Sequence, residues 1–142
     1  MSIHQEVTFA TSPERIYELL TDSAKFTAAT GMPADIGTAA GATFSLFGGR
    51  GEGRHIELVP GDRIVQAWRL NEWRPGIYAI ARFTLTPEAR GTKVVLDVDA
   101  YPEGQSPLYS TWHEHLSTGW PMFYWEPFAR YLESETVASA SV

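Results

Sequence analysis

The run His113-Glu114-His115 contains the residues of this chain that are best suited to chemistry. A metal ion needs its ligands on one side of a segment, and the two histidines are two positions apart. On a helix their side chains diverge by about 200°, so they cannot share a metal there, although they could in an extended segment. We therefore expect His113 to be a hydrogen-bonded histidine at the rim of a pocket, with general acid or base work as the alternative.

Two further patterns resemble functional motifs but have simpler explanations. Asp97 and Asp99 share one strand face and could form a carboxylate pair, but Leu96 and Val98 lie on the opposite face, so we expect a solvated surface. The glycine-rich run 48–53 lacks the Lys-Ser/Thr of a phosphate-binding loop, and we expect no helix after it, so a hairpin turn is favoured. No spacing marks a nucleophile elbow. We predict neither catalytic residues nor a metal site, and no cofactor.

Gln66 is the polar residue with the most informative position. It alternates in phase with Ile64, Trp68 and Leu70 in a strand-like run. If that phase faces inward, Gln66 presents an amide to an apolar interior, where it needs a hydrogen-bonding partner. The opposite phase, with Val65 and Ala67 inward, remains open. In the preceding run we expect a solvated strand that contains Glu52, Arg54, His55 and Glu57.

The elements that would position these residues begin with a strand and two helices. Residues 3–9 alternate between apolar and polar side chains, which predicts a strand. A helix follows, with Ser12 as its cap and Pro13 at its first position. The alternative is a capping box formed by Thr11 and Glu14. A second short helix is expected over residues 24–29, ended by Gly31.

From residue 41 the pattern becomes all-β. Five runs rich in Val, Ile, Phe, Thr and Trp are separated by short turn sequences, which favours antiparallel neighbours. These runs are GATFSLF (41–47), GRHIELV (53–59), DRIVQAWRL (62–70), IYAIARFTLT (77–86) and TKVVLDVDA (92–100). The last two place apolar side chains on one face only, which is typical of a sheet covered on one side.

A long, aromatic C-terminal helix is expected over residues 108–133. At 100° per residue its apolar stripe contains Tyr109, Trp112, Leu116, Trp120, Phe123, Tyr124 and Tyr131. Gly119 lies at the margin of this stripe, whereas Trp125 and Leu132 lie on the opposite face. Pro121 and Pro127 predict a bend or a restart of the helix. A bent helix over a curved sheet leaves a cavity more readily than a straight one, although the aromatic side chains could instead fill the core.

The order of elements predicts an α+β fold: a curved six- to seven-stranded antiparallel sheet wrapped around the long C-terminal helix, with two short helices between the first and second strands. One domain is expected over residues 1–133, followed by a polar tail at 134–142.

The composition restricts the classes of function. The net charge is −6 with no basic run, which disfavours nucleic-acid binding. The absence of cysteine removes disulfides and thiolate sites and fits a cytoplasmic location. No apolar run approaches the length of a membrane span, and no signal peptide is recognised.

Three segments, FATSPERIYELL, GATFSLFGGRGEGRHIELVPGDRIVQAWRLNEW and GWPMFYWEPFARYL, resemble in that order the C-terminal domain of the heat-shock protein 90 ATPase activator (AHSA) family. This family belongs to the START-like helix-grip superfamily. The resemblance covers residues 3–132. It implies a cavity between the sheet and the long helix. Relatives across the superfamily bind lipids, hormones or polyketides, and a minority are enzymes. No catalytic residue of the family can be placed on this chain.

Our leading expectation is a protein that binds an apolar or amphipathic small molecule in that cavity. The expected binding residues are Gln66, Trp68, Phe83, Trp112, His113, Leu116, Trp120, Phe123 and Tyr124. One alternative is a co-chaperone-like interaction protein that uses Trp125, Met122 and Leu132. Another is a hydrolase, cyclase or dehydratase with His113, Gln66 or Tyr78 in the cavity. The two-faced C-terminal helix also suggests a homodimer.

Overall fold

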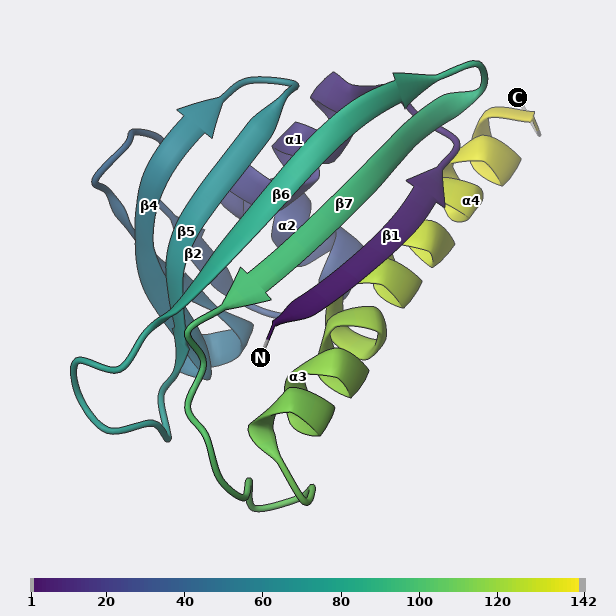
Figure 1. The fold of residues 1–142 in the computed structure, drawn as a ribbon. Helices are drawn as coiled ribbons and strands as arrows, with labels where there is room; N and C mark the ends of the chain where they lie inside the picture. Colours follow the sequence, from purple (N-terminus) through teal and green to yellow (C-terminus); the bar gives the residue numbers. More distant parts are fainter. Residues whose placement is uncertain (1, 141–142) are drawn as a thin grey trace.

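The computed structural model describes residues 2–140 of the chain, with side chains as far as Glu135. Its seven strands form one antiparallel sheet in the order β1-β7-β6-β5-β4-β3-β2 (Figure 1). The strands are β1 (Ile3–Phe9), β2 (Ala34–Ile36), β3 (Thr43–Leu46), β4 (Gly51–Val59), β5 (Arg63–Leu70), β6 (Ala79–Glu88) and β7 (Gly91–Asp99). The α+β prediction is confirmed. The strand that the sequence pattern did not show, β2, has only three residues.

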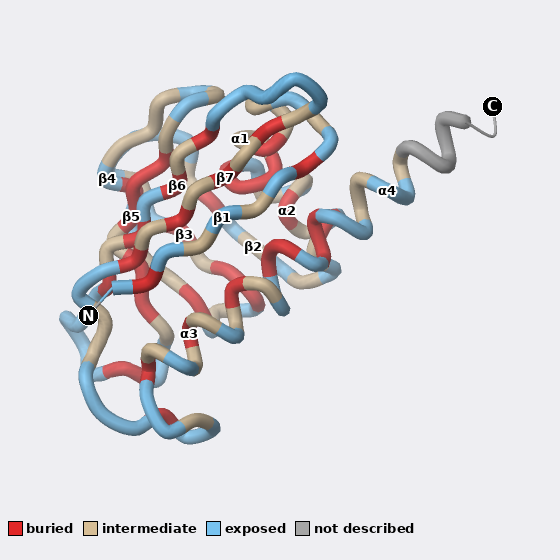
Figure 2. Tube along the Cα trace, turned by 45° about the vertical axis from the view of Figure 1, so that its right-hand side comes forward, coloured by how far each residue is buried: buried red, intermediate tan, exposed pale blue. Residues whose placement is uncertain are grey.

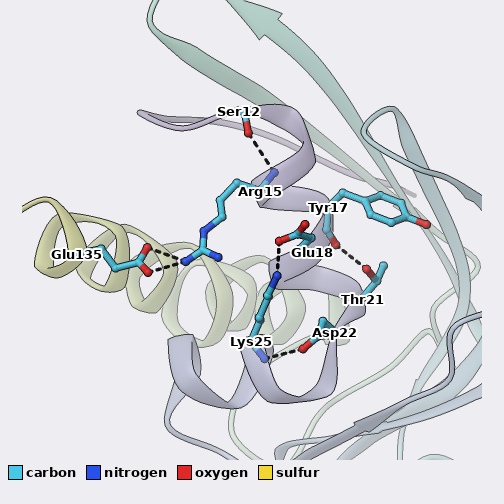
Figure 3. Close-up of polar contacts among 8 residues, drawn as sticks. All are labelled: Ser12, Arg15, Tyr17, Glu18, Thr21, Asp22, Lys25 and Glu135. Atoms are coloured by element: carbon cyan, nitrogen blue, oxygen red, sulfur yellow. Dashed lines mark hydrogen bonds and ion pairs between the residues drawn. The ribbon is translucent and has the colours of Figure 1, made fainter. Parts of the chain in front are cut away.

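The two short helices begin and end at the local signals that the sequence contains. α1 (Pro13–Thr21) is capped by Ser12, whose side chain accepts a hydrogen bond from the Arg15 amide. Asp22 ends α1 and caps α2 (Ser23–Thr30) by accepting from the Lys25 amide (Figure 3). Gly31 then ends α2 in a left-handed conformation that costs glycine little. Ser12, rather than Thr11, is therefore the cap.

The inner face of the sheet carries the core. In β6 and β7 every second residue is buried, as predicted, but the exposed Ile77 precedes β6 and Ala100 follows β7. In Figure 2 the buried parts of the strands and of the helices lie toward one another. α2 packs against α4 (Glu126–Ala140), and Arg15 of α1 forms an ion pair with Glu135 of α4 at 2.6 Å (Figure 3).

The C-terminal helix is one rod with an irregular centre. α3 (Trp112–Trp120) begins after the cap Thr111, later than the expected start at residue 108. A π-helical turn, η2 (Pro121–Trp125), joins it to α4. The helix continues to Ala140, so residues 134–140 of the predicted tail are helical, and its last two residues lie outside the described part.

Gln5 of β1 supports this irregular centre. Pro121 has no N–H, so the Ser117 carbonyl lacks its usual helical donor. The Gln5 Nε2 donates to that carbonyl at 2.9 Å, and its Oε1 accepts from the Trp125 Nε1 at 3.0 Å. The predicted outward position of Trp125 is wrong, because a π turn contains more residues per turn and rotates the following side chains. Trp125 is 6% exposed.

Candidate functional site

A narrow cleft lies where α3 and η2 meet β5 and the turn before β4. Its volume is about 80 Å³. The lining residues are Phe47, Arg50, Trp68, Leu70, Asn71, Glu72, His115, Leu116, Gly119, Trp120, Phe123 and Tyr124. The 3₁₀ turn η1 (Phe47–Gly49) closes one side. Gly119 lies one turn before Phe123 on the same face of the helix, and a Cβ at position 119 would be 4.0 Å from the Phe123 Cδ2.

The floor of the cleft is a cluster of aromatic rings. Trp68 and Trp120 lie with their ring centres 4.7 Å apart, and Tyr124 stacks on Trp120 at 5.3 Å. The Trp68 Nε1 donates to the Tyr124 hydroxyl at 3.2 Å. Burial raises the pKa of Tyr124, so its phenol is neutral and serves as a structural hydrogen-bonding group rather than as a base. These rings occupy most of the space in which we expected a larger cavity.

The rim is polar and carries both signs of charge. Arg50 and Asn71 are joined by their backbones, since the Asn71 amide donates to the Arg50 carbonyl at 2.9 Å. Among the described residues, neither Arg50 nor Glu72 has an ion-pair partner within 4.0 Å. Burial lowers the pKa of His115; Glu72 opposes this shift and Arg50 adds to it. His115 is therefore neutral at pH 7.

Two ring nitrogens of residues that line the cleft have no hydrogen-bond partner among the described residues. The Trp120 Nε1 is buried and unpaired, and Trp120 itself is 2% exposed. The His115 Nδ1 is likewise buried and without a partner. An indole N–H can only donate a hydrogen bond, so this position favours an acceptor atom.

The structure brings five of the nine predicted binding residues together in the cleft: Trp68, Leu116, Trp120, Phe123 and Tyr124. Phe83 and Trp112 are buried in the core beside it, where they contact Trp120 and Trp73 respectively. His113 lies against Tyr101 with ring centres 6.0 Å apart, outside the cleft. Of the two histidines in the run, it is His115 that lines the cleft.

Gln66 faces inward, which is one of the two strand phases that the sequence left open, but it does not line the cleft. Its register partner across β4 and β5 is His55, which is 1% exposed. Our prediction of a solvated His55 is wrong, because the direct pairing of the two residues places both side chains on the inner face. Among the described residues, neither ring nitrogen of His55 nor the Gln66 Oε1 has a partner in good hydrogen-bonding geometry, although the Gly37 backbone lies close enough to His55 to act on its pKa. Burial lowers the pKa of His55, which keeps the ring neutral.

The groups that the enzyme alternative requires are in three different environments. Tyr78 is exposed outside the core, where its ring lies beneath the Arg69 guanidinium at 5.8 Å. His113 and Gln66 have the separate surroundings given above. Within the described residues no group of three or more His, Asp or Glu side chains could hold a metal ion. These three groups therefore do not meet in one place in the described part of the chain.

The sequence pattern missed the rim residues Arg50, Asn71, Glu72 and His115 and the aromatic Phe47. Arg50 lies within the glycine-rich run that we interpreted only as a turn, and Asn71 and Glu72 begin a loop. Their signal was weak, because polar residues in loops are usually solvated. The position of the cleft at the ends of β4 and β5 could be found only from the sheet order.

Comparison with known proteins identifies the family. The family model "Activator of Hsp90 ATPase homolog 1-like protein" matches residues 10–133. The human Activator of 90 kDa heat shock protein ATPase homolog 1 is 29% identical over 119 residues, which are 84% of this chain and 33% of that protein. The chain thus spans about a third of the length of this curated relative.

Solved structures agree on the fold. An HSP90 activator from Plasmodium falciparum superposes with a TM-score of 0.80 at 22% identity, covering 89% of this chain and 91% of the other. The Aha1 dimer from Colwellia psychrerythraea gives 0.72 at 19% identity, with coverages of 89% and 92%. In the described part of this chain, no helix has the length and apolarity needed to cross a membrane. The family match, the sheet order and the long C-terminal helix together show that the chain belongs to the Activator of Hsp90 ATPase homolog 1-like family.

Proposed function

We propose that this chain is an interaction module that binds a chaperone of the Hsp90 type and changes its ATPase rate. One observation carries this proposal: aromatic rings fill the space between sheet and helix and leave a cleft of only about 80 Å³. Pockets for small molecules usually measure roughly 300–1,000 Å³. The space between the sheet and the long helix is therefore too small for such a molecule as it stands, which favours a function at the surface. The names of the curated relatives, together with the family match, support a chaperone as the partner.

The contact surface we propose is the outer side of η2. Met122 is 51% exposed and Phe123 is 36% exposed, and both lie on η2, next to the cleft. Trp125, which we expected to contribute, is buried and bonded to Gln5, so it is not available to a partner. Exposed large apolar side chains of this kind are typical of binding surfaces when they lie together.

The experiment measures binding to the Hsp90-type chaperone of the same organism, and the chaperone's ATPase rate. We expect the double variant Met122→Ser/Phe123→Ser to lose affinity at least about tenfold, because the contact loses two apolar anchors. Ile56→Ser is the matched control, since Ile56 is 51% exposed on β4. The proposal fails if the parent chain neither binds the chaperone nor changes its rate, or if both variants behave alike.

A second candidate function is binding of a small amphipathic molecule in the cleft. Among the described residues the Trp120 Nε1 has no hydrogen-bond partner and Arg50 has no ion-pair partner, which favours such a ligand because it supplies a donor and a charge beside an aromatic floor. Native mass spectrometry of the purified protein tests it. A bound compound of constant mass, removed by unfolding, supports the idea, whereas a clean apo mass from several preparations argues against it.

A homodimer and a cytoplasmic location remain part of this proposal. The Colwellia psychrerythraea neighbour is described as a dimer. In this chain the outward side of α4 carries Glu126, Arg130 and Glu133, so a dimer would have to use the apolar pair on η2 instead. Light scattering of the parent chain and of the Met122→Ser/Phe123→Ser variant tests this. The dimer is contradicted if the parent chain already has the mass of a monomer and the variant has the same mass.

A further inference from the structure

The turn before β4 holds an aromatic residue in a conformation that such residues avoid. Phe47 has a φ of 55°, and Gly48 and Gly49 follow at 68° and 95°. A bulky residue at positive φ is strained, and such strain persists only where the surrounding structure compensates for it. The Gly48 amide donates to the Pro33 carbonyl at 3.1 Å, which is one contact that holds the turn.

Ring contacts supply most of the compensation. The Phe47 ring lies 5.4 Å from the rings of both Phe26 and Tyr124, and 5.6 Å from that of Phe123. Phe26 and Tyr124 are fully enclosed, but Phe123 is 36% exposed. Among the described aromatic pairs, Phe47 is the one ring that Phe123 contacts. Phe123 is thus the most weakly held member of this cluster, and it sits on the irregular π turn.

Phe47 and Phe123 both line the cleft, one from each side. The Trp120 indole also lines the cleft, and its buried Nε1 has no hydrogen-bond partner among the described residues. Arg50 directly follows the strained turn. The cleft therefore combines aromatic walls, a buried donor and a cation, Arg50, that has no ion-pair partner among the described residues. These groups match a small ligand that has an aromatic ring and a carboxylate, because the carboxylate accepts hydrogen bonds and pairs with a guanidinium. Glu72 on the same rim opposes such an anion.

We propose that Phe47 and Phe123 form a gate over a latent site for a small aromatic carboxylic acid. In the open state Phe123 turns outward and the turn 47–49 leaves its left-handed conformation. The ring of the ligand then packs on Trp68 and Trp120, and its carboxylate pairs with Arg50. This inference rests on the second candidate function above and adds to it the class of ligand and the mechanism of access.

The class of ligand is tested with two probes of one shape, phenylacetate and phenylacetamide, titrated by NMR. Arg50→Gln is expected to weaken phenylacetate about tenfold and to leave phenylacetamide unchanged, because only the carboxylate loses an ion pair. Glu72→Gln is expected to tighten phenylacetate. Equal effects of Arg50→Gln on both probes would contradict the assignment of the carboxylate to Arg50.

The gate is tested with variants that leave the floor of the cleft intact. Gly48→Ala makes the closed turn costlier, since alanine tolerates a left-handed conformation poorly, so both probes should bind up to about tenfold more tightly. Gly76→Ala is the control, with a φ of 86° in a different loop and open space around it. Phe123→Ala should also tighten both probes, while Met122→Ala, one position away and outside the cleft lining, should not.

The outcomes separate the gate from the site. If the parent chain binds the probes and neither Gly48→Ala nor Phe123→Ala changes the affinity, the gate is overturned while small-molecule binding stands. If neither the parent chain nor the two opened variants bind either probe, the latent site itself is overturned, and the chaperone proposal is unaffected. Tighter binding by both opened variants but by neither control supports the inference.

Discussion

Gln5 offers the sharpest test of how the long helix is held on the sheet. Its side chain donates to the Ser117 carbonyl at 2.9 Å and accepts from the Trp125 indole at 3.0 Å. We expect Gln5→Met, which keeps the length of the side chain, to remove both hydrogen bonds without leaving a large cavity. Glu6→Gln, on the exposed side of the same strand, is the control.

The expected cost follows from what the substitution leaves unpaired. A hydrogen bond contributes about 0.5–1.5 kcal/mol net, and a buried donor left unpaired costs about 1–3 kcal/mol. Trp125 is 6% exposed and cannot turn to water, whereas Ser117 is only half-buried and its carbonyl can be solvated. The sum is about 2–3 kcal/mol in the free energy of unfolding. For a chain of this size that lowers Tm by about 6–12 °C.

A double-mutant cycle with Pro121→Ala isolates the role of the missing helical donor. Alanine at 121 restores an N–H that can reach the Ser117 carbonyl, so in that background Gln5→Met should cost about 1 kcal/mol less. Urea unfolding followed by circular dichroism and tryptophan fluorescence measures all four chains. Additive effects within about 0.3 kcal/mol would falsify the argument that Gln5 replaces the donor that proline lacks.

Three other substitutions test the interior. Burial lowers the pKa of His55 from an ordinary value near 6.5, so below that pH the unfolded chain binds more protons than the folded chain. The free energy of unfolding should therefore fall on acidification from pH 7 by up to about 1.4 kcal/mol per pH unit. His55→Leu should reduce this slope in urea titrations at several pH values. Gly53→Ala should cost about 3 kcal/mol or more, or prevent folding, because its Cβ would lie 1.9 Å from the Ala67 carbonyl oxygen; a stable variant with unchanged circular dichroism would contradict the pairing of β4 and β5. Tyr124→Phe leaves the Trp68 Nε1 unpaired and should lower the free energy of unfolding by about 1–3 kcal/mol, and a neutral effect in thermal melts would show that water replaces the hydroxyl.

Six of the seven strands and the starts of α1 and α2 were predictable because their signals are local. The alternation in residues 3–9 and the pairing of Ser12 with Pro13 depend on neighbouring residues alone, and both hold in the structure. The sequence left the phase of Gln66 open, because Val65 and Ala67 on the other face are also apolar. In the structure Val65 is buried as well. Sheet register resolves it, because Gln66 faces Ala81 on one side and His55 on the other. A single strand contains no information about these partners.

The positions that could not be predicted depend on how distant segments meet or on a departure from regular helix geometry. A helical projection at 100° per residue placed Trp125 outward because it assumes an unbroken α-helix. The prolines do more than bend the rod, since the Glu126 amide donates to the Pro121 carbonyl five residues back, and the wider turn brings Trp125 inward.

The same π turn explains why the expected cavity is closed and why Phe123 remains at its edge. Widening the helix at residues 121–125 directs Tyr124 and Trp125 into the core together, and these two rings fill space that a regular helix would have left to one side chain. Phe123 is displaced toward solvent, where Phe47 is its aromatic contact. The prolines that suggested a cavity therefore produce the turn whose rings fill it, and they leave Phe123 at its edge, where this side chain can move without unpacking the core. Whether a partner protein or a small aromatic acid moves it is what the Phe123 and Met122 variants decide.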